Sequence, residues 1–249
     1  MIVRQMELIS THKHKKYTLR GLWTLPDGIS ESLIVMFHGY TGHKNENGFL
    51  FRHLSRLLAE KGISTIRYDF MGSGDSDGEF SDMTFFTELE DARNIINQAY
   101  ALNNYKNVIV LGFSMGGAIA TRVSLELQDK IDKLILLSPA GSMNKIAARS
   151  FADNDLEVLD LGGYYLHRDF YDTLVGYDMY KDIETFKKPV VIIHGEEDQA
   201  VDISYGRKYH ELYPHSVMFT IPNSPHCYTK VEYRALVDEY ILRFLGKKL

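Results

Sequence analysis

The hydrophobic residues of this chain occur in short clusters, and their spacing alternates between that of strands and that of helices. Residues 32–37 are apolar from Leu33 onward, a pattern typical of a strand buried on both faces of a sheet. Residues 47–60 place Phe51, Leu54 and Leu58 at helical spacing and predict a helix. The pattern continues with strands expected at 63–68, 107–112, 134–137, 190–193 and 217–221 and helices at 117–123, 84–102, 203–213 and 229–246.

The order of these elements predicts the fold class. Residues 2–9 and 16–25 are expected to be strands, and Pro26, Asp27 and Gly28 mark a turn after the second one. From residue 32 onward, short strands alternate with helices. This order predicts an α/β fold with a mostly parallel central sheet flanked by helices.

Between Pro139 and Pro189 the alternation stops for about fifty residues, which is far longer than an ordinary connection. The stretch is rich in tyrosine and phenylalanine, with acidic residues between them. Two hypotheses remain open for it: a peripheral helical excursion that packs its own aromatic side chains, or a lid over a catalytic face. We expect residues 140–186 to form an inserted subdomain, and residues 1–139 with 187–249 to form the core.

Composition limits the classes of partner. A chain of 249 residues with 45% hydrophobic and 24% charged residues is ordinary for a globular protein. A net charge of −5 gives no basic surface for nucleic acid. The apolar runs are too short to span a bilayer, and residues 1–7 lack the features of a secretory signal. The single cysteine, Cys227, excludes an internal disulfide, so we expect a soluble cytoplasmic protein without a membrane partner.

The candidate chemistry begins at the G-x-S-x-G motif of residues 112–116, which lies between the strand at 107–112 and a helix-like segment. In that context the motif indicates a nucleophilic serine, Ser114, on a tight turn. Gly112 and Gly116 would remove side chains where the two backbones come close. The alternative is a small serine in a phosphate-binding turn, but neither G-x-x-x-x-G-K-[ST] nor G-x-G-x-x-G occurs.

A serine nucleophile needs a base, and His226 is the best placed of the ten histidines. It follows the last expected strand, where the loop should reach the edge of the sheet that carries Ser114. Asp198 is the expected acid, because Gly195 lets the chain turn after the strand at 190–193. The order serine, aspartate, histidine is that of α/β-hydrolases.

Acyl transfer also requires two donors for the developing oxyanion. One is expected to be the backbone N–H of Met115, the residue after the nucleophile. The other is expected from the loop after the strand at 32–37, where Gly39 lets the backbone turn inward and makes the Tyr40 N–H the best candidate. We expect His38 to be a buried structural histidine bonded to backbone, and Asp202 to cap the helix at 203–213.

Taken together, the motifs resemble those of the α/β-hydrolase family. The matching residues are His38-Gly39, Asp69 with its glycine loop, Gly112-x-Ser114-x-Gly116-Gly117, His194-Gly195-x-x-Asp198 and His226. Within the family the chain is similar to bacterial cinnamoyl (feruloyl) esterases. That narrower likeness rests on residues 38–43, Leu137-Ser138-Pro139-Ala140, residues 162–166 and His226-Cys227-Tyr228.

The narrower resemblance implies several further properties. Those esterases are usually dimers whose inserted subdomain binds the phenolic ring, with a tyrosine of that subdomain on the ring hydroxyl; Tyr165 matches that tyrosine. Two features depart from their pattern: residues 142–160 and 167–182 match poorly, and Ser224-Pro225 replaces a glycine or acidic pair. Substrate choice is set by the insertion, so it is less well supported than the catalytic residues.

The sequence thus predicts a serine carboxylic ester hydrolase that acts on a small-molecule ester and needs no metal or organic cofactor. Hydroxycinnamate esters are the expected substrates, because aromatic walls favour planar aryl groups. The alternatives are a carboxylesterase for short or medium acyl chains, a lipase-like esterase or thioesterase, and more remotely a serine peptidase. A binding protein with a silent hydrolase fold is the hypothesis from a different class.

Overall fold

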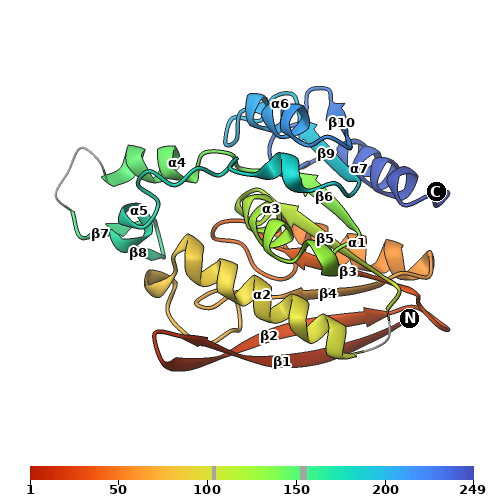
Figure 1. Ribbon diagram of the computed structural model, residues 1–249, viewed down its shortest axis with the longest axis horizontal. Helices are drawn as coiled ribbons and strands as arrows, with labels where there is room; N and C mark the ends of the chain where they lie inside the picture. Colours follow the sequence, from red (N-terminus) through yellow and green to blue (C-terminus); the bar gives the residue numbers. More distant parts are fainter. Residues whose placement is uncertain (103–104, 152–155) are drawn as a thin grey trace.

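A computed structural model describes residues 1–102, 105–151 and 156–249. Within these ranges, eight strands form one sheet in the order β1-β2-β4-β3-β5-β6-β9-β10 (Figure 1). β1 pairs antiparallel with β2, and β2 pairs antiparallel with β4, while the other neighbouring strands are parallel. The strands are β1 (Ile2–His12), β2 (Lys15–Leu25), β3 (Ser32–Phe37), β4 (Ser64–Tyr68), β5 (Asn107–Phe113), β6 (Lys133–Leu137), β9 (Val190–Gly195) and β10 (Ser216–Ile221). The predicted α/β fold with a mostly parallel sheet is confirmed.

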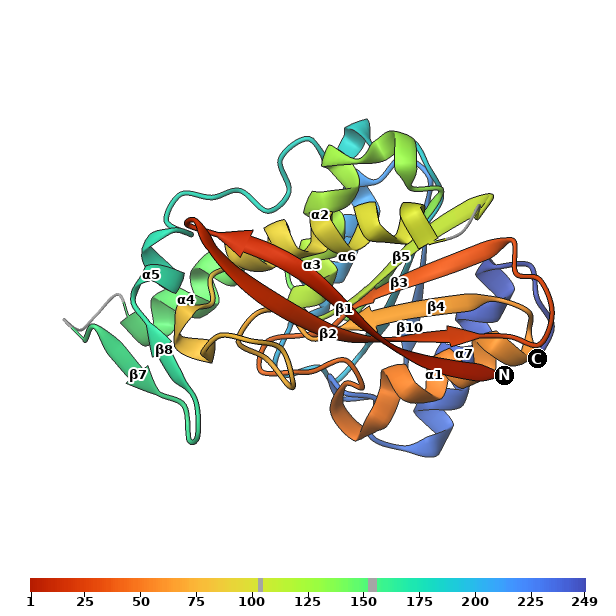
Figure 2. The same cartoon turned by 90° about the horizontal axis from the view of Figure 1, so that it is seen from below.

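Helices cover both faces of the sheet, so each central strand is buried on two sides. In β3, Leu33, Val35 and Phe37 belong to one hydrophobic core and Ile34 and Met36 to the other. Figure 2 shows the two helical layers on opposite sides of the sheet. One layer contains α2 (Phe85–Leu102), α3 (Met115–Glu126) and α6 (Ile203–Leu212), and the other contains α1 (Leu50–Glu60) and α7 (Val231–Phe244). The continuous apolar run at β3 is therefore explained by burial on both faces.

The helix predicted over residues 47–60 begins later than expected. Gly48 and Phe49 have φ values of 57° and 62°, which an α-helix does not allow. Residues 47–49 form only a short 3-10 turn, and α1 starts at Leu50. Apolar spacing alone cannot detect such a backbone reversal, because it is a property of dihedral angles and not of side-chain polarity.

Most of the segment between β6 and β9, from α4 (Met143–Phe151) to α5 (Asp169–Asp172), lies at one end of the molecule in both ribbon views (Figures 1 and 2). The described elements of the segment are α4, β7 (Val158–Asp160), β8 (Tyr165–His167), α5 and the 3-10 helix Ile183–Thr185. β7 and β8 form an antiparallel hairpin that was not predicted. The segment is therefore not the purely helical excursion that one hypothesis described.

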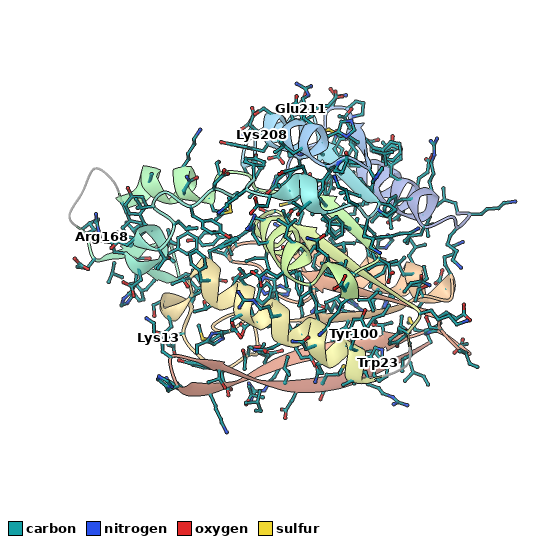
Figure 3. All side chains as sticks on the ribbon, in the orientation of Figure 1. Lys13, Trp23, Tyr100, Arg168, Lys208 and Glu211 are labelled. Atoms are coloured by element: carbon teal, nitrogen blue, oxygen red, sulfur yellow. The ribbon has the colours of Figure 1, made fainter. Side chains whose placement is uncertain are left out.

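The segment between β6 and β9, called the inserted segment below, packs on the rest of the chain as well as on itself. Phe151 stacks on Tyr171 within the segment, and their ring centroids are 6.3 Å apart. Tyr177 meets the ring of Phe86 on α2 edge to face at 5.0 Å. Lys208, labelled in Figure 3, extends from α6 over the ring of Tyr180, 4.2 Å from its centroid. None of the helices in the described part of the chain has the length and apolarity needed to cross a membrane.

Candidate active site

Ser114 lies on a sharp turn between β5 and α3. β5 ends at Phe113 and α3 begins at Met115, so Ser114 alone joins the two elements. Its φ of 56° and ψ of −122° lie in a region that residues with side chains rarely adopt, so this peptide is strained. The N–H groups of Gly117 and Ala140 both donate to the Ser114 carbonyl oxygen, at 2.9 and 3.0 Å, and hold the turn in place.

The two motif glycines are required by close backbone contacts. A Cβ on Gly112 would lie 2.1 Å from the carbonyl oxygen of Gly116. A Cβ on Gly116 would lie 2.1 Å from the carbonyl oxygen of Phe37 at the end of β3. Any side chain at either position would therefore push α3 away from the sheet, as the sequence pattern predicts.

His226 reaches the Ser114 hydroxyl from the loop between β10 and α7. Its Nε2 lies 2.9 Å from Ser114 Oγ. The imidazole packs on Phe113, with ring centroids 4.8 Å apart, which limits its rotation. Two residues further on, the buried Tyr228 donates its hydroxyl to the carbonyl oxygen of Ile193 at 3.0 Å and anchors the loop on β9.

Asp198 faces the other nitrogen of that imidazole. Its Oδ2 lies 2.6 Å from His226 Nδ1, and its Oδ1 accepts the N–H groups of Ala200 and Val201 at 3.0 and 2.8 Å. The Asp198 side chain is fully buried. A carboxylate at Nδ1 keeps the proton of the neutral ring on that nitrogen, which leaves the Nε2 lone pair facing Ser114.

The environment of Asp198 keeps this carboxyl ionised. Burial alone would raise its pKa, but hydrogen bonds from His194 and His226 and the charge of His226 outweigh burial and hold the pKa below its ordinary value. His194 is itself buried on β9, with Nε2 3.3 Å from Asp198 Oδ2 and 2.9 Å from the carbonyl oxygen of Val201. Two histidines therefore contact one carboxylate, and the sequence prediction had named only His226.

The loops that carry Asp198 and His226 are joined through their backbones. The N–H of Glu197 donates to the carbonyl oxygen of Ser224 at 3.0 Å. A Cβ on Gly195 would lie 2.3 Å from the same carbonyl oxygen, so only glycine fits there. The prediction that Gly195 lets the chain turn toward Asp198 thus has a concrete cause, the close approach of Ser224.

The two expected oxyanion donors both belong to backbone next to Ser114. Met115 is the first residue of α3, so its N–H has no acceptor within the helix. Tyr40 is the second residue of a turn in which the Gly42 N–H donates to the Gly39 carbonyl oxygen at 2.9 Å. A Cβ on Gly39 would lie 3.1 Å from Ser114 Cβ, so this turn lies directly against the serine.

Buried polar groups support the same turn from below. His38 Nδ1 donates to the Gly39 carbonyl oxygen at 2.9 Å, and its Nε2 accepts the Phe70 N–H at 3.1 Å. Burial lowers the pKa of His38, which favours this neutral form. The prediction of a structural histidine bonded to backbone is confirmed. Asp69 accepts both the backbone N–H and the ammonium group of Lys44, and so ties its own loop to the Tyr40 loop.

Aromatic side chains from the core and the insertion meet above this turn. The ring of Tyr40 lies 5.5 Å from Phe80 and 5.7 Å from Phe170, which belongs to the inserted segment. Phe80 in turn contacts Tyr164 at 4.9 Å. The predicted ring contact, Tyr165, is the next residue on the hairpin and is 61% exposed. Its neighbour Tyr164 is therefore the hairpin tyrosine that joins the aromatic cluster, through Phe80, which in turn packs on Tyr40.

Comparison with known proteins places this geometry in a family. Residues 28–160, more than half of the chain, match the family model described as serine aminopeptidase, S33. The chain belongs to this family. The matched residues include Ser114 and both expected oxyanion donors, but they end before Asp198 and His226.

Curated relatives and solved structures extend beyond the family match. An AB hydrolase superfamily protein, YisY of Bacillus subtilis, is 26% identical over 234 residues, which cover 78% of this chain and 84% of that protein. Human monoglyceride lipase is 29% identical over 142 residues, or 55% of this chain and 44% of the lipase. The structure of Est1E from Butyrivibrio proteoclasticus with ferulic acid bound aligns with a TM-score of 0.85 and 26% identity, covering 96% of this chain and all of that one. The chain thus has the α/β-hydrolase fold and is similar to esterases.

Sequence reasoning missed several residues around Ser114. Phe113 carried a signal, since it lies inside the G-x-S-x-G motif directly before the nucleophile. His194 carried a weaker signal, since it lies four residues before Asp198 at the end of a buried strand. Glu46, which is only 3% exposed, carried no signal, because the burial of a single glutamate in a loop produces no periodic pattern in the sequence. Among the described residues, no group of three or more His, Cys, Asp or Glu side chains is arranged so that it could hold a metal ion.

Proposed function

We propose that this protein is a serine carboxylic ester hydrolase. Ser114 Oγ attacks the acyl carbonyl carbon while His226 Nε2 takes the hydroxyl proton, and Asp198 stabilises the imidazolium that forms. The N–H groups of Tyr40 and Met115 bind the oxyanion of the tetrahedral intermediate. His226 then gives its proton to the leaving alcohol, and a water molecule, deprotonated by His226, releases the acid from the acyl-enzyme.

One observation carries this proposal. The line from Ser114 Oγ through His226 to Asp198 has spacings of 2.9 and 2.6 Å, both within hydrogen-bond reach. The strained backbone of Ser114 supports the same conclusion, because such strain is concentrated at functional sites. A silent hydrolase fold would have no need for either feature.

The proposal is tested by replacing the nucleophile. Ser114→Ala should lower kcat/KM for p-nitrophenyl acetate by about 10⁴-fold or more, since the attacking atom is lost. Ser124→Ala, a buried serine on α3, should keep the wild-type rate and serves as a matched control. Wild-type turnover by Ser114→Ala would sink the nucleophile assignment.

For the acyl group, we propose hydroxycinnamate esters. The aromatic side chains of Tyr40, Phe80, Phe170 and Tyr164 support this choice, because planar rings pack well against one another. The similarity to a structure that holds ferulic acid supports it further. A higher kcat/KM for methyl ferulate than for methyl butyrate is the expected result, and preference for butyrate would refute it. The contact of Tyr165 with the ring hydroxyl stays a prediction.

A second candidate is an esterase for acylglycerols or other short-to-medium acyl chains. The match to human monoglyceride lipase over 142 residues favours it. A panel that includes monoacylglycerols and acyl thioesters separates the two candidates by their kcat/KM values.

The domain organisation, cellular location and oligomeric state are also proposals. We propose that residues 140–186 act as a lid and substrate-binding subdomain on a core of residues 1–139 and 187–249. A cytoplasmic location rests on the single cysteine, and a homodimer rests on the resemblance to feruloyl esterases. Size-exclusion chromatography with light scattering checks the homodimer.

A further inference from the structure

Glu46 is a buried carboxyl beside the expected oxyanion turn. It lies in the loop between β3 and α1, and the residue is only 3% exposed. A buried carboxyl that lacks a cationic partner is costly, so its presence at this position needs an explanation. Its Oε2 has no hydrogen-bond partner among the described residues.

The carboxyl contacts both ends of the Gly39–Gly42 turn. Its Oε1 accepts the backbone N–H of Gly39 at 3.2 Å. At the other end, a Cβ on Gly42 would lie 2.7 Å from Oε2 and 2.8 Å from Oε1, so the carboxyl occupies the space that a side chain would need. Tyr40 lies between these two contacts, and its N–H is one of the expected oxyanion donors.

The same carboxyl lies close to the nucleophile. A Cβ on Gly39 would be 3.1 Å from Ser114 Cβ and 3.4 Å from Glu46 Oε1, so Gly39 contacts both side chains. A shift of the Gly39 peptide would therefore change how the Tyr40 N–H faces Ser114. Oxyanion donors act only when they are held at the position that the oxyanion will occupy.

The backbone of Glu46 is strained, and hydrogen bonds on both sides hold it in this conformation. Its φ of 60° and ψ of 167° lie in a region that is essentially limited to glycine. Its own N–H donates to the His43 carbonyl oxygen at 2.8 Å, and its carbonyl oxygen accepts the Phe49 N–H at 3.0 Å. These bonds orient the Glu46 side chain toward Gly39 and away from solvent.

We propose that Glu46 is a positioning residue that holds the Gly39–Tyr40 peptide so that the Tyr40 N–H can bind the oxyanion. This inference rests on the proposed function. A glutamine at position 46 would keep an oxygen for the Gly39 N–H, whereas an alanine would leave that N–H without its acceptor.

The test compares kcat and KM for p-nitrophenyl acetate in the full-length protein. Glu46→Ala should lower kcat by about 10–100-fold, because one oxyanion donor is misplaced but not removed, while KM stays within about threefold. Glu46→Gln should keep kcat within about threefold of the wild-type value. The rate of labelling by a fluorophosphonate, whose reaction also develops negative charge at the oxyanion position, should fall in parallel with kcat/KM for Glu46→Ala.

Matched variants separate this role from a general effect on folding. Asp238 on α7 is a second buried carboxyl, bonded to His53 at 2.7 Å, and Asp238→Ala should leave kcat unchanged. If Glu46→Ala does not fold, Gly42→Ala displaces the same carboxyl and should show the same loss of kcat.

Three outcomes are decisive. An unchanged kcat in Glu46→Ala, with an active wild type and an inactive Ser114→Ala, would overturn the inference and leave the proposed function standing. A loss in Glu46→Gln equal to that in Glu46→Ala would also overturn it, since the charge and not the hydrogen bond would then matter. Full activity of Ser114→Ala would instead overturn the proposed function.

Discussion

The loops at the carboxyl edge of the sheet and the segment 140–186 are held by different kinds of contact. At the sheet edge, the backbones approach so closely that a Cβ on Gly112, Gly116 or Gly195 would lie within 2.3 Å of a carbonyl oxygen. In the inserted segment, Gly163 and Gly176 have nothing within 4 Å of such a Cβ, and rings of the segment pack on Tyr40 and Phe86 of the core. The proposed chemistry is thus built from rigid backbone, whereas the proposed acyl site can change through side chains alone.

The largest expected effect tests the rigid region. Asp198→Asn should lower kcat by about 10³–10⁴-fold, because an amide can donate to His226 Nδ1 and so favour the tautomer that cannot accept the Ser114 proton. Glu197→Gln, an exposed neighbour on the same loop, should keep kcat within about twofold. Steady-state kinetics with p-nitrophenyl acetate measure both variants, and equal rates would remove Asp198 from the mechanism.

The backbone contrast itself can be measured by placing one methyl group in each region. Gly116→Ala should lower the free energy of unfolding by about 3 kcal/mol or more, because the new Cβ meets the Phe37 carbonyl oxygen in a packed core. Gly176→Ala should cost about 1 kcal/mol, since only its φ of 74° opposes a side chain. Urea denaturation gives both values, and similar losses would contradict the contrast.

A third expected effect is the pH dependence of stability, in which the two buried carboxyls near Ser114, those of Glu46 and Asp198, have opposite signs. Burial raises the pKa of Glu46 from 4.5 to about 7, partly offset by the N–H groups of Gly39 and Asn47. The folded protein therefore holds a proton that the unfolded chain has lost, and this stabilisation is fully present below pH 4.5 and lost as the pH rises through 7. The shift corresponds to at most roughly 3 kcal/mol. Asp198, with its lowered pKa, has the opposite sign, so its contribution is lost as the pH falls through that lowered pKa.

Glu46→Gln isolates the first of these contributions. Between pH 5 and pH 8, the free energy of unfolding of the wild type should fall relative to that of Glu46→Gln, since glutamine does not titrate. Chemical denaturation at both pH values measures the difference. A wild type that gains stability over this range relative to the variant would show that the Glu46 pKa is not raised.

The smallest expected effect belongs to the inserted segment. Tyr165→Phe should lower kcat/KM for methyl ferulate by about threefold to tenfold, the value of one hydrogen bond, and leave methyl butyrate unaffected. Tyr164→Phe is the matched control, because Tyr164 meets Phe80 through its ring and that contact survives. A loss in Tyr164→Phe but not in Tyr165→Phe would move the predicted contact to the neighbouring tyrosine.

The same contrast explains how much the sequence could predict. Ser114, Asp198 and His226 follow three parallel strands, and the ends of such strands must meet at one edge, so their proximity followed from strand order. The antiparallel β7–β8 hairpin was missed, although Gly162-Gly163 between short apolar stretches is a strong turn signal.

Other features depended on tertiary contacts that leave no mark on the sequence. The start of α1 at Leu50 depends on positive φ values at Gly48 and Phe49. The contacts of Glu46 with Gly39 and Gly42 join residues whose side chains show no common periodicity. Packing of Phe170 on Tyr40 likewise joins the insertion to a loop 130 residues away in the chain. Such pairings are decided by the folded backbone and not by local pattern.

Labelling with a fluorophosphonate tests the central claim most directly, because only an activated serine reacts. We predict that the wild-type protein gains one adduct per chain and that peptide mapping places it on Ser114. Ser114→Ala should remain unlabelled, and Asp198→Asn should react far more slowly. An adduct on another residue, or an unreactive but folded wild type, would contradict a nucleophile activated by His226 and Asp198.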